Sequence, residues 1–244
     1  MKRKLLLISN STMAGEAYLA WPQKYILDFL NKYQVKKVTF VPYAGVNLSN
    51  ESLKASYDVY AEKVSGVFSK MGFQLESVHT TSHPAEMIAN AEAIVVGGGN
   101  TFHLVAEMQK TGIMSAIKEK AEQGTPYVGW SAGSNVACPS LKTTNDMPII
   151  EPASFNTLSL IPFQINPHYL DANPEGHGGE TREQRIEEFL AINRSTKVLG
   201  LREASLLIVD DQSMTLQGSR KLRLFVYGKE PVEYEPGSDL SFLL

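Results

Sequence analysis

The most informative chemical feature of the chain is a G-x-S-x-G motif, formed by Gly129-Trp130-Ser131-Ala132-Gly133. The motif directly follows an apolar stretch with the character of a buried strand. A serine at this point sits on a sharp turn from strand to helix, where small neighbours leave its hydroxyl exposed. The start of the next helix would direct backbone N–H groups at an oxyanion. Ser131 is therefore the candidate nucleophile, and a tight turn without chemistry is the alternative.

A run of glycines forms a second candidate segment, Gly97-Gly98-Gly99-Asn100-Thr101, which also follows a strand-like stretch. Consecutive glycines let the backbone approach a bound group closely. In a hydrolase this segment could supply a second N–H donor to an oxyanion, and in a binding protein it could hold a phosphate. The P-loop pattern G-x-x-x-x-G-K-[ST] is absent, and G-x-G-x-x-G is not met here. A flexible turn is the plainer alternative.

A serine nucleophile requires a base, and His168 is favoured among the histidines of the chain. It follows a strand-like stretch through Asn166-Pro167, and the proline restricts the backbone just before it. His177 is the alternative, but it lies in the glycine-rich segment 175–179, a poorer place for a positioned base. The remaining histidines, which we expect to be structural or exposed, are His79, His83 and His103.

The base needs an orienting acid, and the sequence leaves the choice among several carboxylates open. The candidates are Asp146, Asp171, Glu175, Glu180 and Glu203. Glu203 follows a short strand expected over 197–201, so it could lie at a strand end beside the other candidate residues. Composition alone does not select it.

Arg182 is the candidate for binding an anionic group of a substrate. The segment 181–193 predicts a helix, because Thr181 and Gln184 form a capping box at its start. A cation in the first turn opposes the helix dipole, which costs a little free energy unless the charge has another use. Arg182 could hold a substrate carboxylate, and a solvated arginine on the helix surface is the alternative.

Metal and thiol chemistry are not indicated. The chain has no H-E-x-x-H and no paired C-x-x-C motif, so we expect neither a metal nor a cofactor. Cys138 is the single cysteine, which excludes an internal disulfide. It has no motif of its own, so we expect it to be buried by packing.

These residues must be positioned by an α/β fold. Strands are expected over 4–8, 37–41, 74–78, 93–96 and 126–130, and helices over 21–33, 51–71, 84–91, 101–110 and 113–123. Strands that alternate with helices predict a mostly parallel sheet covered on both faces, with chemistry at the carboxyl ends of the strands. The helix over 51–71 should bury one apolar stripe, made of Leu53, Tyr57, Tyr60, Val64, Val67 and Met71.

The chain changes character after Cys138. Six prolines lie between residues 138 and 174, so this region should be mostly loop, with its best strand over 158–165. The segment 197–244 alternates apolar and polar residues between turns, which predicts antiparallel strands that complete the edge of the sheet. No repeat or linker interrupts the chain, and we predict one domain over residues 1–244.

Composition excludes several classes of function. The 23 Lys and Arg residues are scattered and the net charge is -3, unlike the clustered positive charge of nucleic-acid binders. The apolar run at Leu5–Ile8 is much shorter than the core of a secretory signal or a membrane span. We therefore expect a cytoplasmic protein with neither nucleic acid nor membrane as a partner.

Several longer segments are similar to peptidase E, the α-aspartyl dipeptidase family. They are 97–101, 129–135, 143–149, 164–168 and 176–183, and the segments 5–12 and 42–46 fit as well. The match covers roughly residues 4 to 205, in the right order and spacing. One departure is Ser134, which stands where the bacterial enzymes lead us to expect alanine.

The resemblance implies a fold like that of the class I glutamine amidotransferases, which is flavodoxin-like. It implies a catalytic triad of Ser131, His168 and Glu203. It further implies that the N–H groups of Gly99 and Ala132 form the oxyanion hole.

The resemblance also implies a substrate. Arg182 matches the arginine with which family members recognise an aspartyl side chain, and Asn100 is carried over as a second substrate-binding residue. The family cleaves Asp-X dipeptides, needs a free amino terminus and uses no metal. The expected partner is therefore a small peptide with an N-terminal aspartate, and a homodimer is left open.

Three other functions stay open at this point. An enzyme similar to cyanophycinase would cleave a polyaspartate backbone with the same fold and serine. A generic α/β-hydrolase esterase would combine Ser131 with an acid such as Asp146 and with His168 or His177. A non-catalytic module would use the segment 97–100 to bind a small anion.

Overall fold

A mostly parallel sheet forms the centre of the protein in the computed structural model, which describes residues 2–173, 175–176 and 178–244. Within these residues the sheet has seven strands in the order β3-β2-β4-β5-β1-β8-β9. Its parallel part contains β1 (Lys4–Ile8), β2 (Lys37–Val41), β3 (Gln74–Ser77), β4 (Ile94–Val96) and β5 (Tyr127–Trp130). The sequence predicts all of these strands, with ends that differ by at most one residue.

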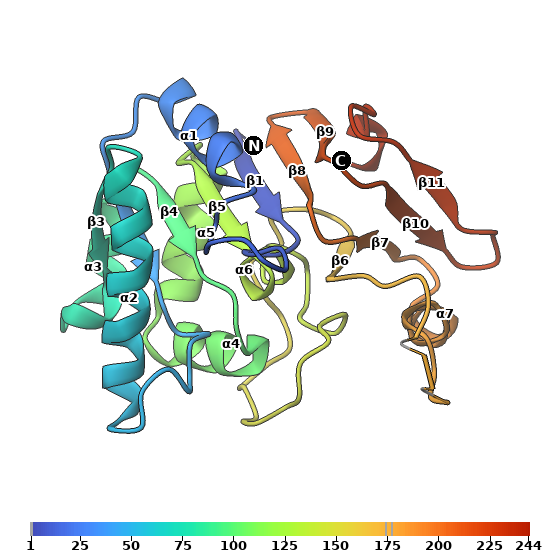
Figure 1. Cartoon of the computed structure of the whole chain (residues 1–244), viewed down its shortest axis with the longest axis horizontal. Coiled ribbons are helices and arrows are strands. Elements are labelled where there is room, and N and C mark those ends of the chain that lie inside the picture. The colour runs from blue at the N-terminus through green and yellow to red at the C-terminus, as the bar shows by residue number, and fades with distance from the viewer. Residues whose placement is uncertain (1, 174, 177) are drawn as a thin grey trace.

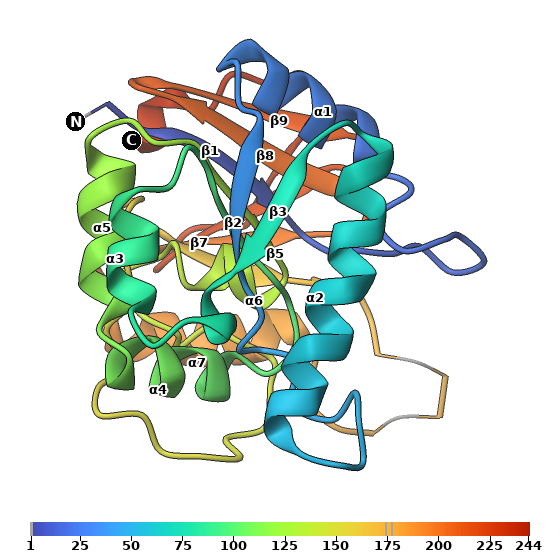
Figure 2. The same cartoon turned by 90° about the vertical axis from the view of Figure 1, so that its left-hand side faces the viewer.

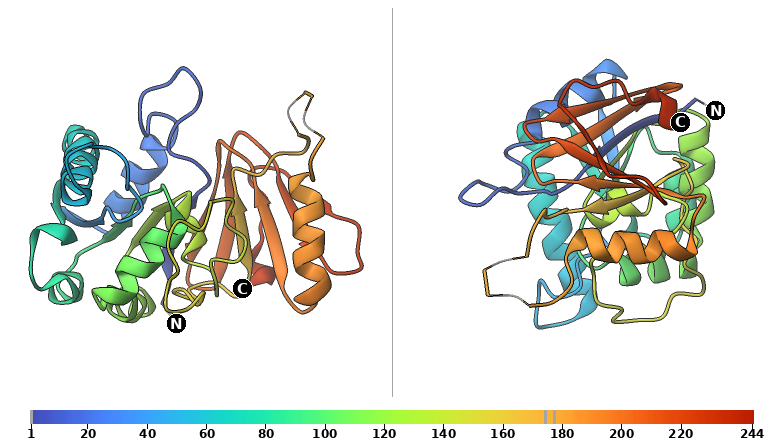
Figure 3. Two further views of the ribbon diagram at one scale, coloured as in Figure 1. Left: turned by 90° about the horizontal axis from the view of Figure 1, so that it is seen from below. Right: turned by 90° about the vertical axis from the view of Figure 1, so that its right-hand side faces the viewer.

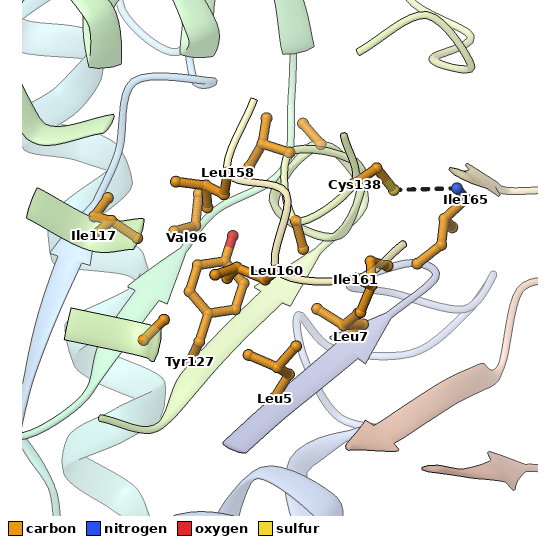
Figure 4. Close-up of a cluster of buried hydrophobic side chains, with 14 of the residues drawn as sticks. Leu5, Leu7, Val96, Ile117, Tyr127, Cys138, Leu158, Leu160, Ile161 and Ile165 are labelled. Atoms are coloured by element: carbon orange, nitrogen blue, oxygen red, sulfur yellow. Dashed lines mark hydrogen bonds between the residues drawn. The ribbon is translucent and has the colours of Figure 1, made fainter. Parts of the chain in front are cut away.

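Helices cover both faces of this sheet, and each face has its own apolar core because alternate side chains of a strand point to opposite faces. Leu6 and Ile8 of β1 pack with α1 and α2, whereas Leu5 and Leu7 pack with α3, α4 and α5. Figure 2 shows the sheet between these layers. Figure 4 shows part of the core that contains Leu5, Leu7 and Tyr127. The helices are α1 (Gln23–Lys32), α2 (Leu53–Lys70), α3 (Pro84–Ala89), α4 (Thr101–Lys110) and α5 (Ile113–Glu122).

The buried face of α2 differs slightly from the expected stripe. Tyr57, Tyr60 and Val64 are buried as predicted, but the fourth large buried side chain is Phe68 rather than Val67. Val67, seven residues after Tyr60, lies at the margin of the same face and packs against the core while partly buried. Leu53 at the start of the helix is exposed.

A second, four-stranded sheet lies beside the first, in the order β11-β10-β7-β6, and Figure 1 shows it next to α7. The prediction that 197–244 completes the edge of the first sheet is therefore correct only for the antiparallel pair β8 and β9. The remaining strands pair with each other, because β7 lies between β6 and β10. The elements are β6 (Gln164–Pro167), α7 (Arg182–Ile192), β7 (Lys197–Leu201), β8 (Ser205–Asp210), β9 (Ser213–Gly218), β10 (Leu222–Val226) and β11 (Val232–Tyr234).

The strand predicted over 158–165 is wrong, because β6 begins only at Gln164. The apolar residues before β6 are buried in the first sheet's core (Figure 4). Their N–H groups donate to carbonyls of residues 136–138 rather than to a neighbouring strand. Leu158 donates to the carbonyl of Val136 at 3.0 Å and Leu160 donates to that of Ala137 at 2.8 Å. These residues are therefore apolar because they are buried, although they do not pair with a strand.

No helix within the described residues is both long and apolar enough to cross a membrane. The organisation as one domain over residues 1–244 stays a prediction. Figure 3 shows the second sheet beside the first from two further directions. Ser9, directly after β1, bonds to the backbone of His168 after β6 and of Leu201 in β7, so the candidate residues of both sheets meet at the carboxyl end of β1.

Candidate active site

The three residues of the expected triad form one hydrogen-bonded series. Ser131 follows β5, His168 follows β6 and Glu203 follows β7. His168 Nε2 lies 2.8 Å from Ser131 Oγ, and His168 Nδ1 lies 3.0 Å from Glu203 Oε1. Because a carboxylate only accepts hydrogen bonds, the imidazole proton belongs on Nδ1. Nε2 is then an acceptor for the serine hydroxyl, which is the arrangement of a general base.

Ser131 has a strained backbone that exposes its side chain. Its φ of 53° and ψ of -113° place a residue with a Cβ in a region that L residues rarely adopt. The short helix α6 (Ala132–Asn135) starts at the next residue. A Cβ on Gly129 would lie 2.3 Å from the carbonyl oxygen of Gly133, so the motif's glycines allow the turn to close.

His168 is also held in a left-handed conformation, with φ 53°. Its backbone N–H donates to Ser9 Oγ at 3.0 Å, and the hydroxyl of Ser9 donates to the carbonyl of Leu201 at 2.8 Å. The buried Ser9, directly after β1, thus joins the first sheet to both β6 and β7. Sequence reasoning did not select it, although its place at the carboxyl end of a strand was a usable signal.

The hydroxyl of Ser134, the residue that stands where alanine is expected, is used in hydrogen bonds within the protein. Its hydroxyl oxygen lies 2.7 Å from the carbonyl oxygen of Ile8 and 2.8 Å from that of Gly129. The single hydroxyl proton can be donated to either carbonyl. The serine therefore ties α6 to the ends of β1 and β5.

The glycine run approaches the nucleophile from β4. A Cβ on Gly99 would lie 2.2 Å from the carbonyl oxygen of Ala44, and the φ of Gly99 is +134°, so glycine is required here. The N–H groups of Gly99 and Ala132 donate to no protein acceptor among the residues that the structure describes. Gly99, Ser131 and His168 all line one cavity of about 450 Å³.

Several of the other residues that line this cavity are apolar or aromatic. They include Tyr18, Val46, Leu48, Tyr60 and Trp130. Lys63 lies at the same cavity, with Nζ 4.1 Å from the centre of the Tyr18 ring. This arrangement suits an apolar group beside a carboxylate.

Arg182 lies apart from the nucleophile's cavity. It lines a smaller cavity of about 180 Å³, together with Asp146, Asn166 and Arg185. Burial and the neighbouring Arg185 lower the pKa of Arg182, while Asp146 acts in the opposite direction. Asn166 is on β6, close in the chain to His168. The helix start is as predicted, because Thr181 and Gln184 form both bonds of a capping box.

Asn100 lines the nucleophile's cavity, but its side-chain amide is used within the protein. Its oxygen accepts from the N–H of His103 at 3.0 Å and so caps α4. Its nitrogen donates to the carbonyl of Met147 at 2.8 Å. Its role in binding substrate stays a prediction.

Three of the other candidate acids have partners away from His168. Asp146 accepts from the backbone N–H of Thr101 at 2.7 Å. Asp171 forms an ion pair with Arg202, and Glu180 lies 3.8 Å from Arg185. Glu175 forms no recorded ion pair within the described residues.

The other histidines do not approach Ser131 among the described residues. His79 bonds to Ser77 and Asp58, and the ring of the buried His103 lies 2.7 Å from the carbonyl of Tyr43. His83 precedes α3 as its cap residue. His177 lies outside the described residues.

Neither a reactive thiol nor a metal centre competes with the serine site within the described residues. Burial raises the pKa of the Cys138 thiol to about 12, and its sulfur accepts from the N–H of Ile165 at 3.1 Å (Figure 4). A thiol with such a pKa has almost no thiolate at neutral pH. The part of the chain described by the structure has no group of three or more His, Cys, Asp or Glu side chains suited to a metal ion.

The chain is similar to known peptidases along almost its whole length. The sequence model of peptidase family S51 matches residues 5–217. Peptidase E of Nostoc sp. strain PCC 7120 is 49% identical over 244 residues, which cover 100% of this chain and 98% of that protein. Peptidase E of Streptomyces coelicolor is 46% identical over 241 residues, which cover 98% of this chain and 94% of the relative.

Two solved structures share the fold. A peptidase from an acI-B1 Actinobacterium has a TM-score of 0.70 at 15% identity, covering 99% of this chain and 98% of that chain. A protein of Listeria monocytogenes EGD-e has a TM-score of 0.61 at 20% identity, covering 96% and 99%. Because the family model spans the whole hydrogen-bonded series and the relatives match from end to end, the chain belongs to peptidase family S51.

Proposed function

We propose that this peptidase is a serine-dependent dipeptidase that hydrolyses peptides with an N-terminal aspartate through an acyl-enzyme. The observation that carries the proposal is the series Ser131–His168–Glu203 beside a cavity. A serine hydrogen-bonded to a base, which is in turn hydrogen-bonded to an acid, performs acyl transfer on many unrelated folds. The name peptidase E of the similar proteins supports the peptidase class. We extend the proposal to a cytoplasmic location.

The proposed reaction begins with attack of Ser131 Oγ on the scissile carbonyl while His168 Nε2 accepts the hydroxyl proton. Glu203 keeps the other ring proton on Nδ1 and stabilises the imidazolium. The N–H groups of Gly99 and Ala132 donate to the oxyanion, and each such donor contributes a factor of about 10²–10³ in rate. His168 then protonates the leaving amine, and water attacks the acyl-enzyme through the reverse proton transfers.

We assign recognition of the aspartyl side chain to Arg182. Its guanidinium borders a cavity that reaches Asn166, on the strand that leads to His168. A planar guanidinium can hold a carboxylate through two parallel hydrogen bonds. The residue after the aspartate would then lie in the aromatic cavity beside Ser131.

The role of Arg182 predicts a change in substrate discrimination. Replacing Arg182 with Ala should lower kcat/KM for Asp-Leu by roughly 10²-fold, because a charge-assisted bidentate contact is lost. The neutral isostere Asn-Leu should lose far less, so the preference for Asp-Leu over Asn-Leu should shrink. Steady-state kinetics on both dipeptides measures this ratio. An equal loss on the two substrates would remove the proposed role.

The decisive experiment is release of free aspartate from Asp-Leu by the purified protein. Glu-Leu, Leu-Leu and N-acetyl-Asp-Leu serve as comparison substrates, with a chelator present and with Ser131→Ala as control. We expect cleavage of Asp-Leu alone, which survives the chelator and is lost in the variant. Unchanged turnover by Ser131→Ala would reject the serine mechanism, and cleavage of Leu-Leu at the same rate would reject the aspartyl specificity.

A further inference from the structure

The hydroxyl of Tyr60 on α2 is a meeting point of hydrogen bonds behind the candidate oxyanion hole. Trp130 Nε1 donates to it at 3.1 Å, and the Tyr18 hydroxyl donates to it at 3.1 Å. The Tyr60 hydroxyl itself donates to the carbonyl of Gly98 at 2.9 Å. These bonds link the residue before Ser131 to the residue before Gly99.

The direction of these bonds leaves no freedom to the Tyr60 proton. The indole N–H of Trp130 can only donate, and the carbonyl of Gly98 can only accept. A phenol has one proton and accepts at its oxygen. With Trp130 and Tyr18 as donors, the proton of Tyr60 has one destination, which is Gly98.

The anchored carbonyl determines where the next N–H points. The chain has no cis peptide bond within the described residues. In the trans peptide that joins Gly98 to Gly99, the C=O and the N–H point in opposite directions. The Gly99 N–H therefore points away from Tyr60. Since both residues are glycines, rotation of this peptide plane meets little steric resistance from the residues themselves.

The packing shows that the Tyr60 ring is seated firmly against the backbone. A Cβ on Gly45 would lie 2.5 Å from Tyr60 Cδ1, and a Cβ on Gly97 would lie 2.6 Å from its hydroxyl oxygen. Tyr60 is 5% exposed and also packs edge-on against Phe40 at 5.2 Å between ring centres. The backbone N–H groups of Gly97 and Asn100 donate to the carbonyls of Val41 and Ala44. These bonds fix the chain on either side of the Gly98–Gly99 peptide, but they do not fix the orientation of the peptide plane itself.

We propose that Tyr60 is a positioning residue, whose hydroxyl holds the Gly98–Gly99 peptide so that the Gly99 N–H faces the oxyanion. The inference rests on the proposed acyl transfer at Ser131. Tyr60 acts through this peptide and touches no reacting atom. Loss of the hydroxyl alone should release the peptide plane while the ring continues to fill its place.

The test compares Tyr60→Phe with Tyr57→Phe. Tyr57 is one turn earlier on the same helix and is also buried, but its hydroxyl has no hydrogen-bond partner within the described residues. For Tyr60→Phe we expect a fall in kcat on Asp-Leu of roughly 10- to 100-fold with KM nearly unchanged, within the value of one oxyanion donor. Affinity for a peptide aldehyde, which forms a tetrahedral adduct, should fall by a similar factor. Tyr57→Phe should match the parent protein.

A crystal structure of Tyr60→Phe gives a readout that does not depend on turnover. We expect the Gly98–Gly99 peptide to be rotated or to occupy two orientations. An unrotated peptide in the variant, or a kcat equal to that of the parent, would overturn the inference. Failure of the proposed function shows itself separately, as full activity of Ser131→Ala or no cleavage of Asp-Leu by the parent protein.

Discussion

Two residues of the hydrogen-bonded series, Ser131 and His168, share an unfavourable positive φ. Each has φ 53°, although neither is a glycine. Such conformations cost roughly 1–3 kcal/mol each and persist only where the surroundings enforce them. The backbone N–H of Ser131 donates to the carbonyl of Ile8 at 3.0 Å, and that of His168 donates to Ser9 Oγ at 3.0 Å. Ser131 and His168 are two of the residues to which we assign chemistry, and Ala204, directly after Glu203, also has a positive φ of 59°.

Glu203 provides a test at the scale of one residue. Replacing Glu203 with Gln keeps the shape but removes the charge that favours a proton on His168 Nδ1, so kcat should fall by about 10²–10⁴-fold. Replacing Glu180, which is exposed near the start of α7, with Gln should leave kcat unchanged. Steady-state kinetics on Asp-Leu measures kcat for both variants. A normal kcat for Glu203→Gln would mean that another group orients the imidazole.

The residues of the site differ in how far the sequence could predict them. The G-x-S-x-G motif marks Ser131 locally, because the strand and the turn adjoin it in the chain. The acid stayed open among five carboxylates without the resemblance, since β7 meets β6 only through bonds between distant segments. The helical repeat predicts Tyr60 as part of a packing stripe, but nothing in that repeat shows that its hydroxyl reaches Gly98.

At the scale of elements, Arg202 secures the end of β7 directly before Glu203. Its guanidinium donates to Asp171 through Nε at 2.8 Å and to Glu233 through both terminal nitrogens at 2.8 Å. These hydrogen bonds lower the pKa of both carboxyls below their ordinary values of 3.8 and 4.5. The Arg202 side chain is mostly buried, with 12% exposure, so the contacts join β7 to its neighbours.

The Arg202 contacts predict a dependence of stability on pH. Because the folded protein depresses the pKa of Asp171 and Glu233, their contribution is present above the ordinary values and is lost as pH falls through the depressed ones. The free energy of unfolding should therefore decrease below about pH 5. Arg202→Gln should cost about 1–2 kcal/mol at pH 7, since the carboxylates are partly exposed, and should flatten this decrease. Urea unfolding between acid and neutral pH measures both, and parallel pH curves for variant and parent would contradict the assignment.

The elements also show the limit of pattern reading. The first five strands are predictable because short runs, most of them apolar, alternate with amphipathic helices. The run from Leu158 to Phe163 has the same composition, yet Pro162 lacks an N–H and the neighbouring N–H groups bond to residues 136–138. Likewise, alternation in 197–244 predicts strands but carries no information about which sheet each one joins.

At the scale of the whole molecule, the residues beyond the family match remain part of the fold. The match ends at residue 217, but β10 pairs with all of β7, and Leu240 and Leu243 are buried in the first sheet's core. A chain that ends at Gly218 should therefore lose cooperative unfolding and activity together. Circular dichroism during heating and the Asp-Leu assay measure these losses. A truncated chain that melts cooperatively and cleaves Asp-Leu would show that the second sheet is dispensable.

The division of the series between two sheets has a consequence for biosynthesis. Ser131 leaves the ribosome with the first sheet's parallel strands, whereas His168 and Glu203, the proposed base and acid, follow β6 and β7. A nascent chain thus carries an unactivated serine until β7 has docked through Ser9. A ribosome-stalled chain lacking residues after 196 should not react with a serine-directed acylating probe. The proposed nucleophile would in this way become activated only late in the synthesis of the chain.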